Sequence, residues 1–203
     1  MTQRRDWAQE DALAAMRSVL AERYLALKVR RYVLEEDFDA ATSRVEFWLA
    51  LNEAPAEALT GVGVGLIDAL FGGLRARFAA EHPSLESVSF SSLHVRGLAC
   101  DGAAALSTAA QVEARVGVRN SYGNVFDFAV VSESVSRSSV SAVVAAVEYF
   151  VNAERAYVAL FMAREQAARD GRPALVEQYT SRLSEMVRNT SYSAVIERLR
   201  AVR

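Results

Sequence analysis

The sequence has few of the residues from which disulfides, metal centres and membrane spans are built. Its one cysteine, Cys100, excludes an intramolecular disulfide and is typical of a reducing compartment. The two histidines, His82 and His94, form no His-x-His pair. No uninterrupted apolar run reaches the ~20 residues that a membrane helix needs. We therefore expect a cytoplasmic protein without a membrane segment, a metal or another cofactor.

Concentrated charge is also missing. The net charge is −2, and basic and acidic residues are spread along the 203 positions, so a nucleic-acid partner is not expected. The N-terminal residues 1–7 become polar and acidic where a signal peptide would become apolar. Hydrophobic residues make up 52%, which is enough for a packed core. The length predicts one domain with helical extensions.

Hydrophobic periodicity predicts two kinds of element. Alternation with a period of two predicts strands at 24–34, 44–51, 57–62, 85–98, 111–118 and 125–131. Helical spacing predicts helices near 3–21, 66–78, 140–161, 175–187 and 195–199.

The order strand, strand, strand, helix occurs twice, which indicates an internal repeat. The sequence therefore predicts an α+β fold of two β-β-β-α units related by pseudo-symmetry, with additional N-terminal and C-terminal helices. The predicted parts are a helix at 1–22, a double domain at 23–168 with units near 23–82 and 84–168, and a helical extension at 172–203. The terminal helices would cover a sheet edge, bind a second chain or pad the fold, and we favour an oligomer contact.

A glycine-rich stretch lies where the third strand should turn into the first helix after it. Gly61, Gly63 and Gly65 occupy every second position, so no side chain keeps another chain or a ligand away from the backbone. The first N–H groups of the helix would favour a carboxylate. Leu66 stands where a dinucleotide motif needs its third glycine, so a nucleotide site is excluded. A tightly packed turn and a ligand cradle both remain open.

Two acidic residues, Asp68 and Asp101, are candidates for contact with a ligand. Asp68, near a helix N-terminus, would stabilise the helix dipole or meet the ammonium group of an amino-acid ligand. Asp101 would play the same part or hold its own turn through an Asx hydrogen bond.

Three segments resemble the C-terminal regulatory domain of 2-isopropylmalate synthase and its citramalate synthase relatives. The stretch 60–70, Thr-Gly-Val-Gly-Val-Gly-Leu-Ile-Asp-Ala-Leu, is similar to that family's Gly-x-Gly-Asn-Gly-Pro-(Val/Ile)-Asp-Ala-(Leu/Phe). Residues 101–105 are similar to its Gly-Thr-Asp-Ala loop, and 138–142 to the start of a helix that ends near an Asn, here Asn152. The resemblance covers about 25–160, roughly two-thirds of the chain.

This resemblance implies a dimerising double β-β-β-α fold that binds a branched-chain amino acid as a feedback inhibitor. The effector would lie between the units and contact Gly61, Gly63, Gly65, Asp68, Asp101, Gly102, Ala103 and Ala104. Departures from the family pattern at Val64, Leu66 and 132–135 favour an alternative, an assembly module that has lost its effector. The leading Met1 and the additional N-terminal helix favour a complete small protein over a piece of a longer synthase.

No catalytic constellation is visible in the sequence. The chain is shorter than the ~250 residues of the barrel on which such synthases work. Cys100 has no histidine nearby in sequence, and the serines between 132 and 141 lack a nucleophile elbow. We therefore expect a homodimeric, noncatalytic regulatory domain that acts on a separately encoded synthase subunit. An enzyme of another type is the least favoured alternative.

Overall fold

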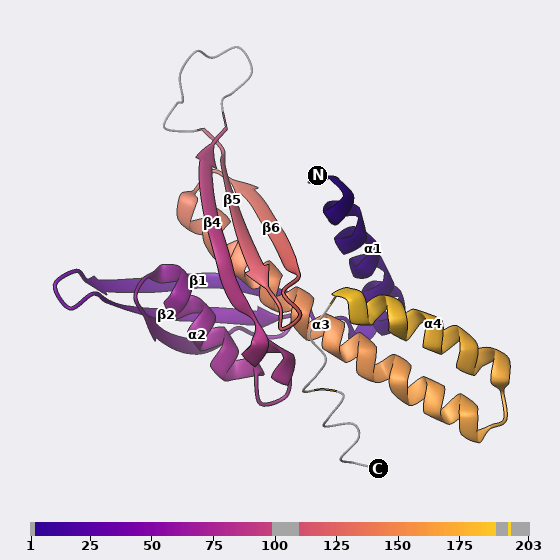
Figure 1. Ribbon diagram of the computed structural model, residues 1–203. Helices are drawn as coiled ribbons and strands as arrows, with labels where there is room; N and C mark the ends of the chain where they lie inside the picture. The colour runs from indigo at the N-terminus through magenta and orange to yellow at the C-terminus, as the bar shows by residue number, and fades with distance from the viewer. Residues whose placement is uncertain (1–2, 99–109, 190–194, 196–203) are drawn as a thin grey trace.

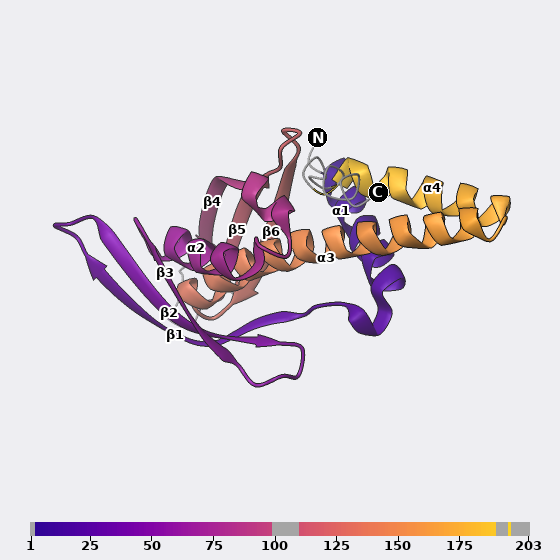
Figure 2. The ribbon, with the colours of Figure 1, turned by 90° about the horizontal axis from the view of Figure 1, so that it is seen from below.

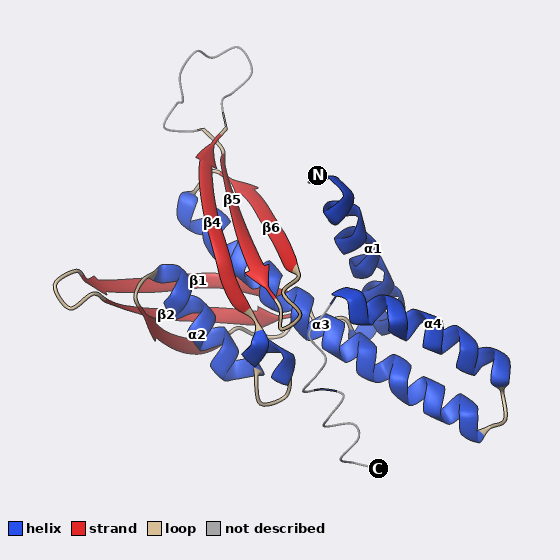
Figure 3. Ribbon diagram, viewed as in Figure 1, coloured by secondary structure: helices blue, strands red, loops and turns tan. Residues whose placement is uncertain are grey.

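The computed structural model describes residues 3–98, 110–189 and 195, which form an α+β fold of two three-stranded antiparallel sheets with helices (Figure 1, Figure 3). The first unit contains β1 (Leu27–Asp37), β2 (Thr42–Leu51), β3 (Glu57–Gly63) and α2 (Leu66–Phe78). The second contains β4 (Ser89–Gly97), β5 (Val112–Arg119), β6 (Val125–Ser132) and α3 (Val135–Arg169). The terminal helices are α1 (Gln3–Leu20) and α4 (Pro173–Asn189). The predicted fold class and the twofold β-β-β-α order are confirmed.

The first sheet has the order β1-β2-β3, and α2 packs on one of its faces. Alternate residues of β2 are buried on that face, among them Val45, Phe47 and Leu49, whereas Arg44 and Glu46 between them are exposed. The alternating pattern therefore gives a sheet with one buried face, because successive side chains of a pleated strand point to opposite faces.

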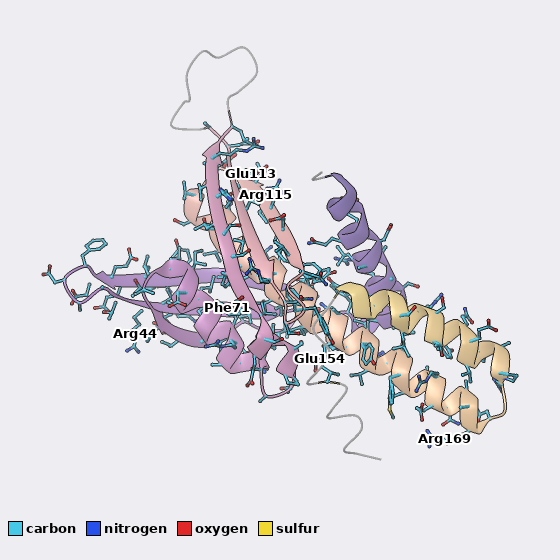
Figure 4. All side chains as sticks on the ribbon, viewed as in Figure 1. Arg44, Phe71, Glu113, Arg115, Glu154 and Arg169 are labelled. Atoms are coloured by element: carbon cyan, nitrogen blue, oxygen red, sulfur yellow. The ribbon has the colours of Figure 1, made fainter. Side chains whose placement is uncertain are left out.

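The second sheet has the order β4-β5-β6, and α3 covers β5 and β6. Aromatic side chains pack between them: Tyr149 and Phe150 of α3 lie against Phe126 and Phe128 of β6, with ring centroids 5.3 to 6.4 Å apart. Such pairs contribute roughly 0.5 to 1.5 kcal/mol each beyond their buried area. Phe71 of α2, labelled in Figure 4, connects the two units. Its ring meets that of Phe90 of β4 edge to face, with centroids 4.7 Å apart.

Helix α3 is longer than the sequence pattern predicts and contacts elements of both units and both terminal helices. It has 35 residues and contacts α1, α2, α4, β1, β5 and β6. Ser134 caps its first turn by accepting a hydrogen bond from the Arg137 N–H at 3.3 Å. Beyond the sheets, α4 folds back along α3 (Figure 2). Gly171, with φ +66°, adopts the left-handed turn between these two helices.

A buried side-chain amide fixes the segment that leads into β1 to the middle of α3. Asn152 is fully buried; its Oδ1 accepts the Leu25 N–H at 2.9 Å, and its Nδ2 donates to the Leu25 carbonyl at 2.8 Å. One turn earlier, Glu148 accepts the Tyr24 hydroxyl at 2.9 Å and the Leu27 N–H at 2.8 Å. Residues 24–26 were predicted as strand, but they lie outside β1, and α3 side chains take backbone groups here.

A second boundary also differs from the prediction. The strand expected from residue 85 begins at Ser89, because Pro83 starts a short 3₁₀ helix, Pro83–Ser87, that precedes β4. Proline favours the first position of such a turn, since its fixed φ suits it and its missing N–H is not needed there.

Helix α1 lies beside the free edge of β6. The Gln9 side chain donates from Nε2 to the Asp127 carbonyl at 3.1 Å and accepts the Asp127 N–H at Oε1, at 3.3 Å. It thus covers part of an edge strand that has no further strand to pair with in the described chain. An oligomer contact of the terminal helices stays a prediction. None of the helices within the described ranges has the length and apolar character needed to cross a membrane.

Replacing Asn152 with alanine should destabilise the protein strongly. The change leaves the buried N–H and carbonyl of Leu25 without partners, and we expect a loss of about 2 to 3 kcal/mol in the free energy of unfolding. Gln166→Ala is the matched control: it removes an exposed amide from the same helix and should cost less than about 0.5 kcal/mol. Urea denaturation measures both variants, and equal losses would contradict the role of the Asn152 pairing.

Candidate functional site

The predicted glycine stretch lies at the junction between β3 and α2. Gly61 and Gly63 lie among the last three residues of β3. Gly65 is the N-cap residue of α2 and has an extended backbone conformation. The sequence of these positions is compatible with a packed turn and with a ligand cradle.

Two of these glycines are in close contact with the backbone of α2. A Cβ placed on Gly61 would collide with the carbonyl oxygen of Ala69 and lie 2.9 Å from the N of Gly73. A Cβ on Gly63 would lie 2.6 Å from the N of Ala69 and collide with Asp68. A Cβ on Gly65 would meet no described atom within 4 Å. Gly61 and Gly63 therefore permit close helix-to-strand packing, whereas Gly65 borders open space.

Asp68 lies at the third position of α2 and is exposed. Its Oδ2 accepts the Val64 N–H at 3.1 Å, so the carboxylate closes the turn that precedes the helix. Its charge also lies at the positive end of the helix dipole. The helix-stabilising interpretation thus has a visible contact, and an ammonium contact stays a prediction.

The remaining predicted residues, Asp101, Gly102, Ala103 and Ala104, lie outside the described residues, and so does Cys100. The flanking strand ends, Gly97 and Val112, pair with each other across β4 and β5.

Both histidines lie outside the junction between β3 and α2. His82 follows α2, where its Nδ1 is 3.9 Å from Oε1 of the buried Glu154. His94 lies on β4, opposite Arg115 of β5. In the part of the chain that the structure describes, no three His, Cys, Asp or Glu side chains are grouped so that they could hold a metal ion.

A cavity of about 380 Å³ lies between α1, the second sheet and α3, and sequence reasoning did not find it. Its charged lining residues are Glu10 of α1, Arg115 of β5, Asp127 of β6 and Glu148 of α3. Four elements contribute these side chains, so no local spacing in the sequence could have indicated the cavity.

Arg115 and Glu113 of β5, both labelled in Figure 4, form a small ionic group with Arg96 of β4. The Nε of Arg115 lies 3.7 Å from Oε1 of Glu113, and Arg96 donates two hydrogen bonds to the same carboxylate at 3.2 Å. The hydrogen bond from Arg96 is the main reason why the pKa of Glu113 lies below its ordinary value.

Two tyrosines in the cavity wall have raised pKa values. Burial raises the pKa of Tyr149, whose hydroxyl finds no hydrogen-bond partner among the described residues. Burial also raises the pKa of Tyr24, and the neighbouring Glu148 carboxylate adds to this shift. Both phenols therefore act as neutral groups in the folded protein at neutral pH.

The chain matches no protein-family model and no curated protein.

Adding a methyl group at Gly61 should be far more destabilising than adding one at Gly65. We expect Gly61→Ala to lower the free energy of unfolding by about 3 kcal/mol or more, because the new Cβ collides with the carbonyl of Ala69. Gly65→Ala, the matched control, should cost about 1 kcal/mol or less. Thermal and urea unfolding measure the difference; a tolerated Gly61→Ala would contradict the tight packing.

The raised pKa of Tyr149 predicts that the protein becomes less stable at alkaline pH. The folded-state pKa of this tyrosine lies above the ordinary 10.0, so the unfolded chain releases its proton first and stability falls as the pH rises past that value. Tyr149→Phe should lower this slope by up to about 1.4 kcal/mol per pH unit. At pH 7 the variant should be at least as stable as the parent, because it removes a buried hydroxyl that lacks a partner among the described residues.

Urea unfolding at a series of pH values between 7 and 11 is the measurement. Identical slopes for the parent and the variant would rule out the proposed protonation of buried Tyr149.

Proposed function

We propose that the chain is a noncatalytic, homodimeric regulatory domain that resembles the feedback-inhibitor domain of 2-isopropylmalate synthase. In this proposal it is cytoplasmic, binds a branched-chain amino acid and acts on a separately encoded synthase subunit. The observation that carries the proposal is the position of residues 60–70, which form the strand-to-helix junction in the first of two β-β-β-α units.

The geometry of this junction supports binding of a carboxylate. The first turn of α2 has N–H groups without intrahelical partners, and the positive end of the helix dipole adds to their attraction for an anion. Gly65 borders open space there, so a small ligand can approach the helix from this side. An apolar ligand side chain would find the exposed Val62 and Val64 nearby.

A second function is favoured by the contacts of Asp68. Its carboxylate already accepts the Val64 N–H, and α2 already fills the space above Gly61 and Gly63. A junction whose groups serve the protein's own packing suits an assembly module that keeps the dimerising fold without an effector.

Titration with L-leucine, L-isoleucine and L-valine distinguishes the two functions. For a regulatory domain we expect at least one of them to raise the thermal unfolding temperature and to give a saturable calorimetric signal. A ligand at 100 times its Kd stabilises the folded state by about 2.7 kcal/mol. D-Leucine is the control, since a specific site distinguishes the enantiomers.

If none of the three stabilises the protein at millimolar concentration, the regulatory function is contradicted and the assembly module is favoured. Sedimentation equilibrium tests the common element of both proposals, a homodimer with twice the 22.2 kDa mass of the chain.

A further inference from the structure

We propose that the cavity between α1, the second sheet and α3 binds a small organic ammonium compound that carries an apolar group. This site is distinct from the glycine stretch, and the inference does not depend on the function proposed above. The cavity has about 380 Å³, within the lower part of the range of small-molecule sites.

Its walls combine apolar surface with negative charge. Leu13, Phe128 and Ala145 provide apolar surface from three different elements. Sites for small molecules generally pair such a lining with a few polar groups that set the orientation of the ligand.

The charge balance favours a cation. Glu10, Asp127 and Glu148 contribute three carboxylates, and Arg115 contributes one guanidinium. Arg115 also lies 3.7 Å from Glu113, a carboxylate outside the lining, which offsets part of its charge. Arg17 stacks on the ring of Tyr24 at 4.3 Å, and it is not among the lining residues. An ammonium group in the cavity would therefore find more negative than positive partners.

The carboxylates differ in how far the protein already uses them. Glu148 is engaged by the Tyr24 hydroxyl and the Leu27 N–H, so both of its oxygens have partners. The hydrogen bonds between Gln9 and Asp127 involve the backbone of Asp127 and leave its carboxylate out. We therefore assign the main ammonium contact to Asp127, and Glu10 of α1 adds a second negative charge to the lining.

Tyr149 provides an independent indication of a ligand. It lines the cavity, only 3% of its surface is exposed, and its hydroxyl has no hydrogen-bond partner in the described chain. Buried hydroxyl groups in native proteins are nearly always paired, so an unpaired hydroxyl on a residue of the cavity wall favours an additional partner in this region.

Three compounds with one carbon skeleton separate the chemical possibilities. 3-Methylbutylamine has only the ammonium group, L-leucine has ammonium and carboxylate, and 4-methylpentanoate has only the carboxylate. We expect calorimetry to show saturable binding of the amine, of leucine or of both at millimolar concentration, and none of the acid. Binding of leucine alone also supports the inference and assigns the ligand carboxylate to Arg115, whereas binding of the amine alone assigns the site to amines without a carboxylate.

Variants then locate the site. Asp127→Asn should weaken binding about tenfold or more, because it removes the charge from the main partner of the ammonium group. Ala145→Leu places a larger side chain in the wall and should weaken binding without any change of charge. Glu46→Gln on the exposed side of β2 is the matched control, since Glu46 does not line the cavity, and it should leave binding unchanged. Circular dichroism establishes that each variant is folded.

Several results would overturn the inference: no binding of amine or leucine, equal binding of 4-methylpentanoate, or full binding in folded Asp127→Asn and Ala145→Leu proteins. Loss of leucine binding in Asp68→Asn together with its retention in Asp127→Asn would also overturn it, and would support the glycine stretch as the effector site instead.

Discussion

The pairing of Asn152 with the backbone of Leu25 is the interaction on which the arrangement of the fold depends. It joins residues 127 positions apart, and it connects the segment before β1 of the first sheet to the helix that covers the second sheet. Because the amide is fully buried, losing it would leave polar groups without water as a substitute partner. Glu148 reinforces the same junction one turn earlier, through Tyr24 and Leu27. The position of the first unit on α3 is therefore specified by polar contacts as well as by apolar burial.

The elements of the fold follow from local patterns, and their mutual placement does not. Alternation along residues 44–51 predicts β2, because a pleated strand with one buried face has apolar side chains at every second position. The helix after Gly65 is predicted in the same way, from apolar side chains at helical spacing. The segment 24–26 alternates too, yet Asn152 of α3 takes the backbone N–H and carbonyl of Leu25. This pairing is a tertiary effect that periodicity cannot contain. Helix α3 likewise extends to Arg169, beyond the predicted apolar stripe, and α4 packs along it.

The candidate sites were predictable to different degrees for the same reason. Gly61, Gly63, Gly65 and Asp68 are close in sequence, so a motif could indicate them, but the contact of Gly61 with Ala69 depends on how α2 packs. The cavity residues Glu10 and Glu148 lie on different helices and become neighbours only through the docking of α1 on β6 and α3. A site assembled from four elements has no spacing that a single sequence can reveal.

The two sites also differ in what a ligand would gain. At the glycine stretch the protein has already engaged the carboxylate of Asp68 and packed the strand against α2, so a ligand there competes with existing contacts or uses only the outer N–H groups. In the cavity, the Tyr149 hydroxyl has no partner among the described residues, and carboxylates outnumber the guanidinium. An ammonium ligand there would pair with carboxylate charge that the lining leaves unbalanced. It would also bridge α1 to β6 beside Gln9, so its binding energy would stabilise the docking of the N-terminal helix as well.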